Sequence, residues 1–131
     1  MEYKMREIQN KLMKGLLDLV ILQLLKNESM HGYQIITSIR RNFGVYFGPS
    51  TIYPLLNSLE EKGYIKSEWN LNNERPRKVY TLTKEGYALL NFTEDSLNHI
   101  CQKLMNMGIN KIVINGHLHK PVIQTTVKNN H

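Results

Sequence analysis

The sequence predicts a mainly α fold with a small β-hairpin and a long last helix. Three observations predict this fold class. Apolar residues recur at the spacing of amphipathic helices in three successive segments before Gly63. Two short β-prone runs, residues 64–69 and 78–82, then flank a polar loop. After Thr83, leucines recur every seven residues along a further helical segment.

Composition limits the class of protein and its partners. The 131 residues allow one domain with a modest core, which favours an oligomer. The 17 Lys+Arg and 11 Asp+Glu give a formal net charge of +6, which favours a polyanionic partner. The single cysteine, Cys101, excludes an intrachain disulfide and a multi-cysteine metal site. The apolar run 15–25 is too short to cross a bilayer, so we expect a cytoplasmic protein.

The first helix is predicted over residues 5–26. Its apolar stripe is expected to consist of Ile8, Leu12, Leu16, Leu19, Val20 and Leu24, widened by Leu17, Ile21, Leu22 and Leu25. Such a stripe covers most of the circumference and requires burial on more than one side. Either a core or a second subunit must therefore cover the surplus face.

A second helix is predicted from His31 to about Asn42, after a polar break in which Ser29 is a candidate N-cap. Gly44 is expected to end it, because glycine tolerates the left-handed conformation that follows many helices. Its inner face is expected to consist of Ile35, Ile36, Ile39 and Phe43.

A third helix is predicted between Pro49 and Gly63. Ser50 or Thr51 is expected to cap its start, and Pro54 to fall in its first turn, where a missing N–H costs little. The buried stripe is expected to be Leu55, Leu56 and Leu59, and the outward side chains Ser50, Thr51, Tyr53, Asn57 and Ser58. Small or aromatic hydrogen-bonding groups suit phosphates and base edges, so this helix has the composition of a DNA recognition helix.

A hairpin follows the three helices, with residues 70–76 as its loop. This order is typical of a winged helix-turn-helix, in which the hairpin is the wing. The loop and its exit hold Arg75, Arg77 and Lys78, the densest basic cluster in the chain. Beside a recognition helix these cations would face phosphates, whereas a solvated loop of ordinary charge is the alternative. Tyr80 and Leu82 are expected to fill the core side of the wing.

Four blocks of the sequence carry a family resemblance. They are His31-Gly32-Tyr33-Gln34-Ile35, Ser50-Thr51-Ile52-Tyr53-Pro54-Leu55-Leu56, Leu59-Glu60-Glu61-Lys62-Gly63-Tyr64-Ile65, and Arg77-Lys78-Val79-Tyr80-Thr81-Leu82-Thr83 with Glu85-Gly86. In their order and spacing, over about residues 12–90, they resemble the PadR family of transcriptional regulators. The resemblance implies a homodimeric, operator-binding repressor or regulator whose winged-helix domains are joined through a C-terminal helix.

The resemblance also implies which residues contact DNA. Tyr33 and Gln34 would lie near the DNA backbone at the start of the second helix. The major groove would receive Ser50, Thr51 and Tyr53, with Asn57 on the same outward face, and the wing would present Arg75, Arg77 and Lys78. For two residues a structural role stays open instead. In that case, Tyr33 packs its ring against the hairpin, and His31 starts the second helix without any role in titration.

Residues 84–108 are predicted to form a dimerisation helix after the DNA-binding domain of residues 5–83. The seam is expected to consist of Leu90, Leu97 and Leu104, with Ile100 and Met107 at the intervening steps. This seam is short, so the helix is also expected to pack against the first helix, where Leu16 joins the interface. A two-fold dimer would set two recognition helices ~34 Å apart and predicts a roughly palindromic operator.

Residues 109–131 are predicted to form a tail or an added hairpin around Asn115-Gly116, with Pro121 confining the second run to an edge. His99, His117, His119 and His131 are weak evidence for a metal, and we expect none. We also expect no cofactor. The last helix has no Trp or Tyr beyond Tyr87, so no strong aromatic-stacking site is expected there, and any small-molecule effector is unknown.

Enzymatic functions find little support. The sequence contains no phosphate-binding glycine loop, no dinucleotide fingerprint and no nucleophile elbow. The leading hypothesis is a dimeric regulator that binds double-stranded DNA. The alternative is a winged-helix module that binds protein through the same outer face.

Overall fold

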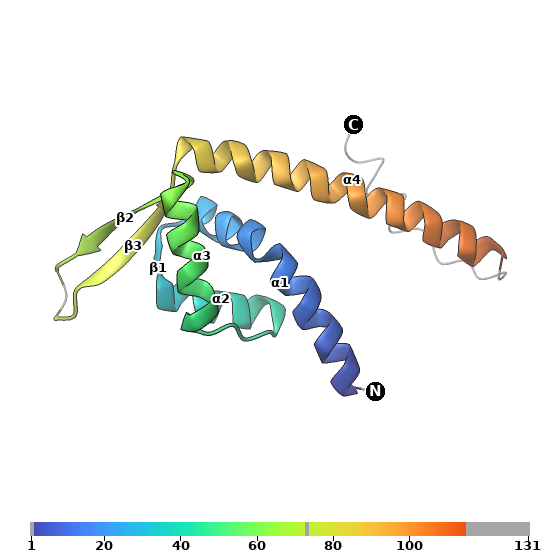
Figure 1. The fold of residues 1–131 in the computed structure, drawn as a ribbon, viewed down its shortest axis with the longest axis horizontal. Helices are drawn as coiled ribbons and strands as arrows, with labels where there is room; N and C mark the ends of the chain where they lie inside the picture. The colour runs from blue at the N-terminus through green and yellow to red at the C-terminus, as the bar shows by residue number, and fades with distance from the viewer. Residues whose placement is uncertain (1, 73, 115–131) are drawn as a thin grey trace. The chain divides into compact units, whose positions relative to one another are not determined.

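A computed structural model describes residues 2–72 and 74–114, with side chains for residues 4–72 and 74–108. The elements are α1 (Glu2–Asn27), β1 (Met30–His31), α2 (Gly32–Phe43), α3 (Pro49–Glu61), β2 (Ile65–Asn70), β3 (Arg77–Leu82) and α4 (Lys84–Ile114) (Figure 1). The strands form one antiparallel sheet in the order β1-β3-β2. The predicted fold class, mainly α with a hairpin wing and a long last helix, is confirmed.

Two compact units divide the chain, Met1–Thr93 and Glu94–His131. The first extends past residue 83, where the sequence predicts its end, because the first turns of α4 pack into it. Gly86 lies so close to the Tyr64 carbonyl and the Leu82 side chain that a Cβ there would overlap both. Leu90 is fully buried in this unit, with 0% of its surface exposed.

The core of the first unit draws on every element. Its fully buried members are Tyr80, Leu17, Ile21, Leu22, Ile35, Ile39, Ile52, Leu56, Ile65 and Leu90. In the second half of α1 most of the predicted apolar residues are buried, and Leu16 and Leu24 are half-buried. In the first half, Ile8 and Leu12 are exposed. Their exposure leaves the surplus apolar face of α1 uncovered by the chain's own core.

The start of α2 differs from the prediction. The N-cap is His31 instead of Ser29, since the Gln34 N–H donates to His31 Nδ1 (3.3 Å) and the His31 N–H donates to Gln34 Oε1 (3.0 Å). This pair of bonds is a capping box. Ser29 Oγ instead shares a hydrogen bond with Thr81 Oγ1 (2.8 Å). The adjacent β1, which pairs with Tyr80 and Val79, was not predicted, because two residues are too few to show strand periodicity.

The end of α2 is at Gly44 as predicted. Gly44 has φ +70° and its N–H donates to the Arg40 carbonyl (2.9 Å). The prediction for Phe43 was wrong: its side chain is 45% exposed. As the last residue of the helix, Phe43 has no further turn to hold its ring against the core.

The start of α3 also differs. Gly48 is the N-cap without a side-chain bond, and Pro49 occupies the first turn, so neither Ser50 nor Thr51 caps the helix. Pro54 lies inside the helix, beyond its first turn, and it lacks the N–H that would bond the Ser50 carbonyl.

For α3, the predicted end is confirmed, and the predicted inward face differs at one residue. The buried residues are Ile52, Leu56 and Leu59, so Ile52 replaces the predicted Leu55, which is half-buried. Gly63 follows the helix at φ +83°, as predicted.

The wing is β2–β3, and its register places three pairs on one face: Ile65 with Leu82, Ser67 with Tyr80, and Trp69 with Lys78. The first pair is buried and Trp69 is exposed, so this face passes from the core to solvent. The predicted burial of Tyr80 and Leu82 is confirmed.

The last helix, α4, continues to Ile114. Residues 109–114 are therefore helical, and of the two alternatives predicted for residues 109–131, a tail or an added hairpin, the first strand of the hairpin does not form there. The predictions for Asn115-Gly116, Pro121, His117, His119 and His131 lie outside the described residues. None of the described helices combines the length and apolarity needed to cross a membrane.

Candidate nucleic-acid interface

A hollow of about 760 Å³ opens between α3, the start of α2 and the wing. Figure 1 shows the hairpin projecting away from these two helices. The hollow is lined by His31, Gly32, Tyr33, Tyr53, Asn57, Trp69, Arg75, Pro76, Arg77, Lys78 and Tyr80. Six predicted contacts meet here: Tyr33, Tyr53, Asn57, Arg75, Arg77 and Lys78. Gln34, Ser50 and Thr51 are not part of its lining.

The outward face of α3 carries Ser50, Tyr53 and Asn57, all exposed. Their spacing of three and four residues places them one above another on a helix. Thr51 is half-buried, and its N–H donates to the Gly48 carbonyl (3.0 Å). The first turns of α3 therefore offer hydroxyl and amide groups along one line.

Tyr53 also joins α3 to the start of α2. Its ring and hydroxyl lie against Gly32, and a Cβ on Gly32 would overlap them. Gly32 is buried at this point. Glycine at the first position of α2 therefore permits the close approach that fixes the Tyr53 side chain at the edge of the hollow.

His31 connects the same corner to the wing. Its Nε2 lies 2.9 Å from Arg77 Nη1, and its ring stacks with that of Tyr33 at 6.5 Å between centroids. Burial, and then the Arg77 charge, lower the pKa of His31 below its ordinary 6.5. Burial and a neighbouring positive charge both disfavour the protonated, positively charged imidazolium. Tyr33 is exposed and stacks on His31, and Gln34 uses its side-chain oxygen in the capping box.

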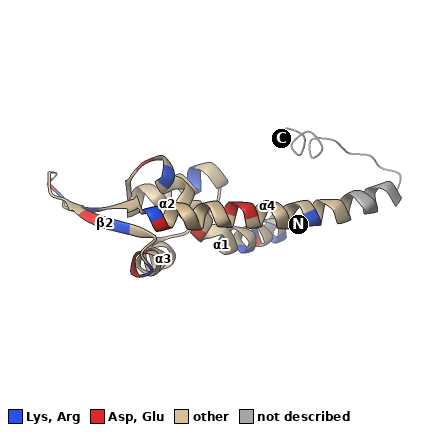
Figure 2. Cartoon of the chain, turned by 90° about the horizontal axis from the view of Figure 1, so that it is seen from above, with Lys and Arg blue, Asp and Glu red and all other residues tan. Residues whose placement is uncertain are grey.

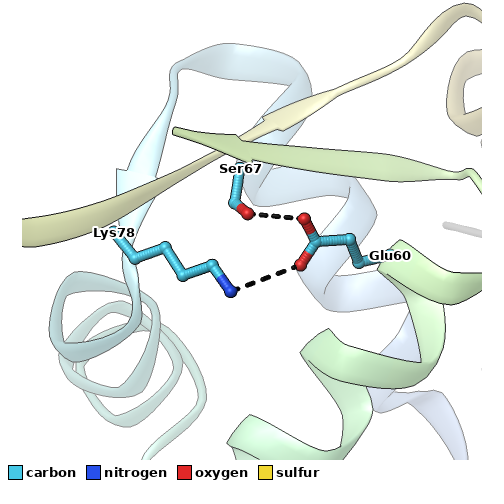
Figure 3. A network of polar contacts seen from close by, with 3 residues as sticks. All are labelled: Glu60, Ser67 and Lys78. Atoms are coloured by element: carbon cyan, nitrogen blue, oxygen red, sulfur yellow. Dashed lines mark hydrogen bonds and ion pairs between the residues drawn. The ribbon is translucent and has the colours of Figure 1, made fainter. Parts of the chain in front are cut away.

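A second polar network joins α3 to both strands of the wing (Figure 3). The Ser67 hydroxyl on β2 donates to Glu60 Oε2, and Lys78 Nζ on β3 lies 3.7 Å from Glu60 Oε1. Lys78 Nζ also lies 5.9 Å from the centroid of the Tyr80 ring. Burial raises the pKa of Tyr80, and the negative charge of Glu60 adds to the increase.

Charge on the wing is mixed along its strands. Figure 2 shows basic and acidic segments following each other on β2, where Lys66 and Glu68 lie. Among the wing cations, Lys78 is paired with Glu60 and Arg77 contacts His31. Arg75 is exposed and forms no ion pair with any residue that the structure describes.

Sequence reasoning missed three features of this region. The roles of Glu60 and His31 depend on contacts between residues 7 to 46 positions apart, which no local pattern carries. Trp69 was placed on the wing but not in the hollow. The first predicted strand ends at residue 69 and the second begins at residue 78, so direct pairing of these two strand ends could have placed Trp69 beside Lys78.

The surfaces predicted for dimerisation are partly accessible. Leu90 was wrongly assigned to the seam, because its side chain is buried within the first unit. Leu16 and Leu97 are half-buried. The remaining seam residues are exposed, namely Ile100, Leu104 and Met107.

Known proteins match most of this chain. The transcriptional regulator PadR-like family matches residues 21–91. Transcriptional regulator Rv3488 of Mycobacterium tuberculosis is 30% identical over 101 residues, which cover 77% of this chain and 90% of that protein. A PadR family regulator from Eggerthella lenta has a TM-score of 0.74 at 28% identity, over 81% of this chain and 93% of that chain. Bacillus subtilis PadR in complex with operator DNA has a TM-score of 0.54 at 30% identity, over 58% of this chain and 44% of that chain.

The matched segment, residues 21–91, covers more than half of the 131 residues. It includes β1, α2, α3 and the wing, which together supply every residue that lines the hollow. The predicted resemblance is confirmed, and it makes this protein a transcriptional regulator and not an enzyme. The chain belongs to the PadR-like family of transcriptional regulators.

Proposed function

We propose that this protein acts as a homodimer, binds a roughly palindromic operator in double-stranded DNA and represses transcription. The observation that carries the proposal is the hollow in which the outward face of α3 meets the wing cations. Bacillus subtilis PadR, which shares this fold, was solved with operator DNA, and this supports the same ligand here. A protein with this function works in the cytoplasm with the DNA.

The residues in and beside the hollow have distinct roles in this proposal. Ser50, Thr51, Tyr53 and Asn57 present hydrogen-bonding groups to base edges in the major groove. Arg75 and Arg77 face phosphates along the neighbouring groove, and Tyr33 and Gln34 contact the backbone beside α2. Phosphate contacts supply affinity and base contacts supply discrimination, so the two sets differ in their response to salt and sequence.

Homodimerisation is supported by apolar side chains that stay exposed within each unit. On α1 these are Met5, Ile8 and Leu12, and on α4 they are Ile100, Leu104 and Met107. On each helix these side chains recur at a spacing of three or four residues, and an exposed apolar stripe of this kind is typical of a helix that packs against a partner. Leu97 and Leu16 complete the proposed interface, and Leu90 is removed from it. A two-fold dimer then reads two half-sites about one DNA turn apart, ~34 Å.

The test is selection of bound duplexes from a random library, followed by affinity measurements over a range of salt concentrations. We expect a two-fold symmetric motif and a logarithmic salt slope near −0.9 per phosphate contacted. Light scattering on the free protein checks the dimer. A monomer at working concentrations would contradict the palindromic mechanism.

A protein-interaction module is the second candidate. It is favoured by Trp69 and Leu71, which expose 62% and 71% of their surface at the wing end. An apolar protein interface responds much less to salt than phosphate contacts do. A folded dimer that enriches no DNA sequence would move the function to this candidate.

A further inference from the structure

The Glu60 side chain reaches from the recognition helix to both strands of the wing. One carboxylate oxygen accepts the Ser67 hydroxyl on β2, and the other lies 3.7 Å from Lys78 Nζ on β3 (Figure 3). Ser67 and Lys78 lie on the same face of the hairpin, in the successive pairs Ser67–Tyr80 and Trp69–Lys78 of that face. One side chain therefore connects three elements that line or adjoin the hollow.

A carboxylate in this place has an electrostatic cost for a DNA-binding protein. It repels the phosphates that the neighbouring cations attract, and it offsets the charge of Lys78. Glu60 and Lys78 expose 32% and 35% of their side chains, so solvent screens their attraction and the pair alone is weak. The Ser67 bond is charge-assisted and adds directional strength to the network.

We propose that Glu60 is a positioning residue for DNA binding: it fixes the wing against α3 and holds Lys78 away from phosphates. This inference rests on the proposed DNA-binding function. Glu60 holds the hairpin at Ser67, midway between the buried Ile65–Leu82 pair and the exposed Trp69. Holding the hairpin there sets the direction in which the loop, with Arg75, leaves the domain.

The proposal changes the role of Lys78. The sequence predicts it as a phosphate contact, but in this proposal its ammonium is held by Glu60 and lies 5.9 Å from the centroid of the Tyr80 ring. Lys78 then contributes to the shape of the wing and adds nothing to the number of phosphates neutralised. Removing the Glu60 charge releases a cation that becomes available to DNA.

The test compares Glu60→Gln with Glu61→Gln. Both substitutions remove one negative charge from the end of α3, but Glu61 is exposed and contacts neither wing strand among the described contacts. We expect Glu60→Gln to steepen the logarithmic salt slope by about 0.9, one additional phosphate, and to reduce discrimination between operator and random DNA. Glu61→Gln should leave both quantities unchanged.

Lys78→Gln, alone and combined with Glu60→Gln, completes a double-mutant cycle. In the wild-type background we expect it to leave the salt slope unchanged, because Lys78 is held by Glu60. In the Glu60→Gln background it should reverse the steepening of about 0.9. A flattening of about 0.9 in the wild-type background would overturn the proposal, because Lys78 would then already contact DNA.

A measurement without DNA isolates the wing itself. Trp69 is the only tryptophan of the sequence and lies two residues from Ser67, so its time-resolved fluorescence anisotropy reports wing motion. We expect larger nanosecond motion in Glu60→Gln and in Ser67→Ala than in wild type or Glu61→Gln. Ser67→Ala tests the hydrogen bond while the carboxylate remains. Circular dichroism confirms that each variant is folded.

The outcomes separate this inference from the function it rests on. If wild type binds an operator with a steep salt slope but Glu60→Gln matches Glu61→Gln in every readout, Glu60 has no positioning role and DNA binding stands. If Trp69 motion increases as expected but neither wild type nor any variant binds DNA, the contact between wing and helix stands and the proposed function fails.

Discussion

Arg77 Nη1 lies 2.9 Å from His31 Nε2 and so joins the wing to the N-cap of α2. A neutral imidazole has one N–H, so His31 cannot accept from Arg77 and from the Gln34 N–H at the same time. Whichever ring nitrogen of His31 carries the N–H, protonation of the other nitrogen removes the only acceptor of the ring. It also places a positive charge beside the Arg77 guanidinium. This corner of the domain is therefore built around a neutral His31.

The neutral state makes stability depend on pH. The pKa of His31 is lowered in the folded state by burial and then by Arg77, so the unfolded chain binds more protons as pH falls below about 7. The contribution of His31 to stability is complete above its unfolded pKa and is lost as pH falls through that value toward the lower folded pKa. We expect thermal unfolding to show that His31→Asn, which keeps a capping side chain, loses less stability than wild type between pH 7 and 5. Equal losses in the two proteins would contradict this role.

Arg77→Ala should weaken binding to all DNA sequences and flatten the salt slope by about 0.9, because one phosphate contact is lost. The measurement is affinity for operator and random duplexes at several salt concentrations. Lys66→Ala is the matched control, since Lys66 is an exposed cation of the same wing outside the lining of the hollow. An unchanged slope in Arg77→Ala would remove the wing from the mechanism.

Thr51→Ala should mainly reduce discrimination among sequences. Loss of a base contact costs about 1–3 kcal/mol for the preferred base pair, while phosphate contacts are kept. Competition between the selected operator and single-base variants measures this loss. Thr37→Ala, on α2 outside the hollow, should leave the base preferences unchanged. Uniform weakening by Thr51→Ala across all duplexes would place Thr51 at the backbone instead.

Leu104→Asp should dissociate the proposed homodimer. Leu104 is exposed on α4, so the change leaves the core of the first unit intact while placing a charge in an apolar interface. Light scattering over a dilution series should show a monomer, and operator affinity should fall with it. Asn98→Asp adds the same charge at an exposed polar position of α4 and should remain dimeric. A dimer of unchanged strength in Leu104→Asp would exclude this helix face.

Local patterns predicted much of this fold, and contacts between distant segments supplied the rest. Gly44 and Gly63 were identified as helix ends because positive φ favours glycine wherever the chain turns out of a helix. The capping role of His31 could not be found in this way, since histidine is not among the preferred N-caps and its position is fixed partly by Arg77. Leu90 fits a heptad, yet its burial depends on how the first turns of α4 pack, which periodicity does not encode.

Gly32 is a sharper case, because its role depends on one side chain of another helix. A Cβ at residue 32 would overlap the ring and hydroxyl of Tyr53, so Gly32→Ala should destabilise the domain by about 1–3 kcal/mol, as overpacking does. Gly15→Ala is the control: Gly15 lies in α1 with open space around it, and alanine there should stabilise by about 0.5–1 kcal/mol. Denaturant unfolding measures both. Adding Tyr53→Ala to Gly32→Ala should recover part of the loss, and a purely additive result would show that the two residues do not meet.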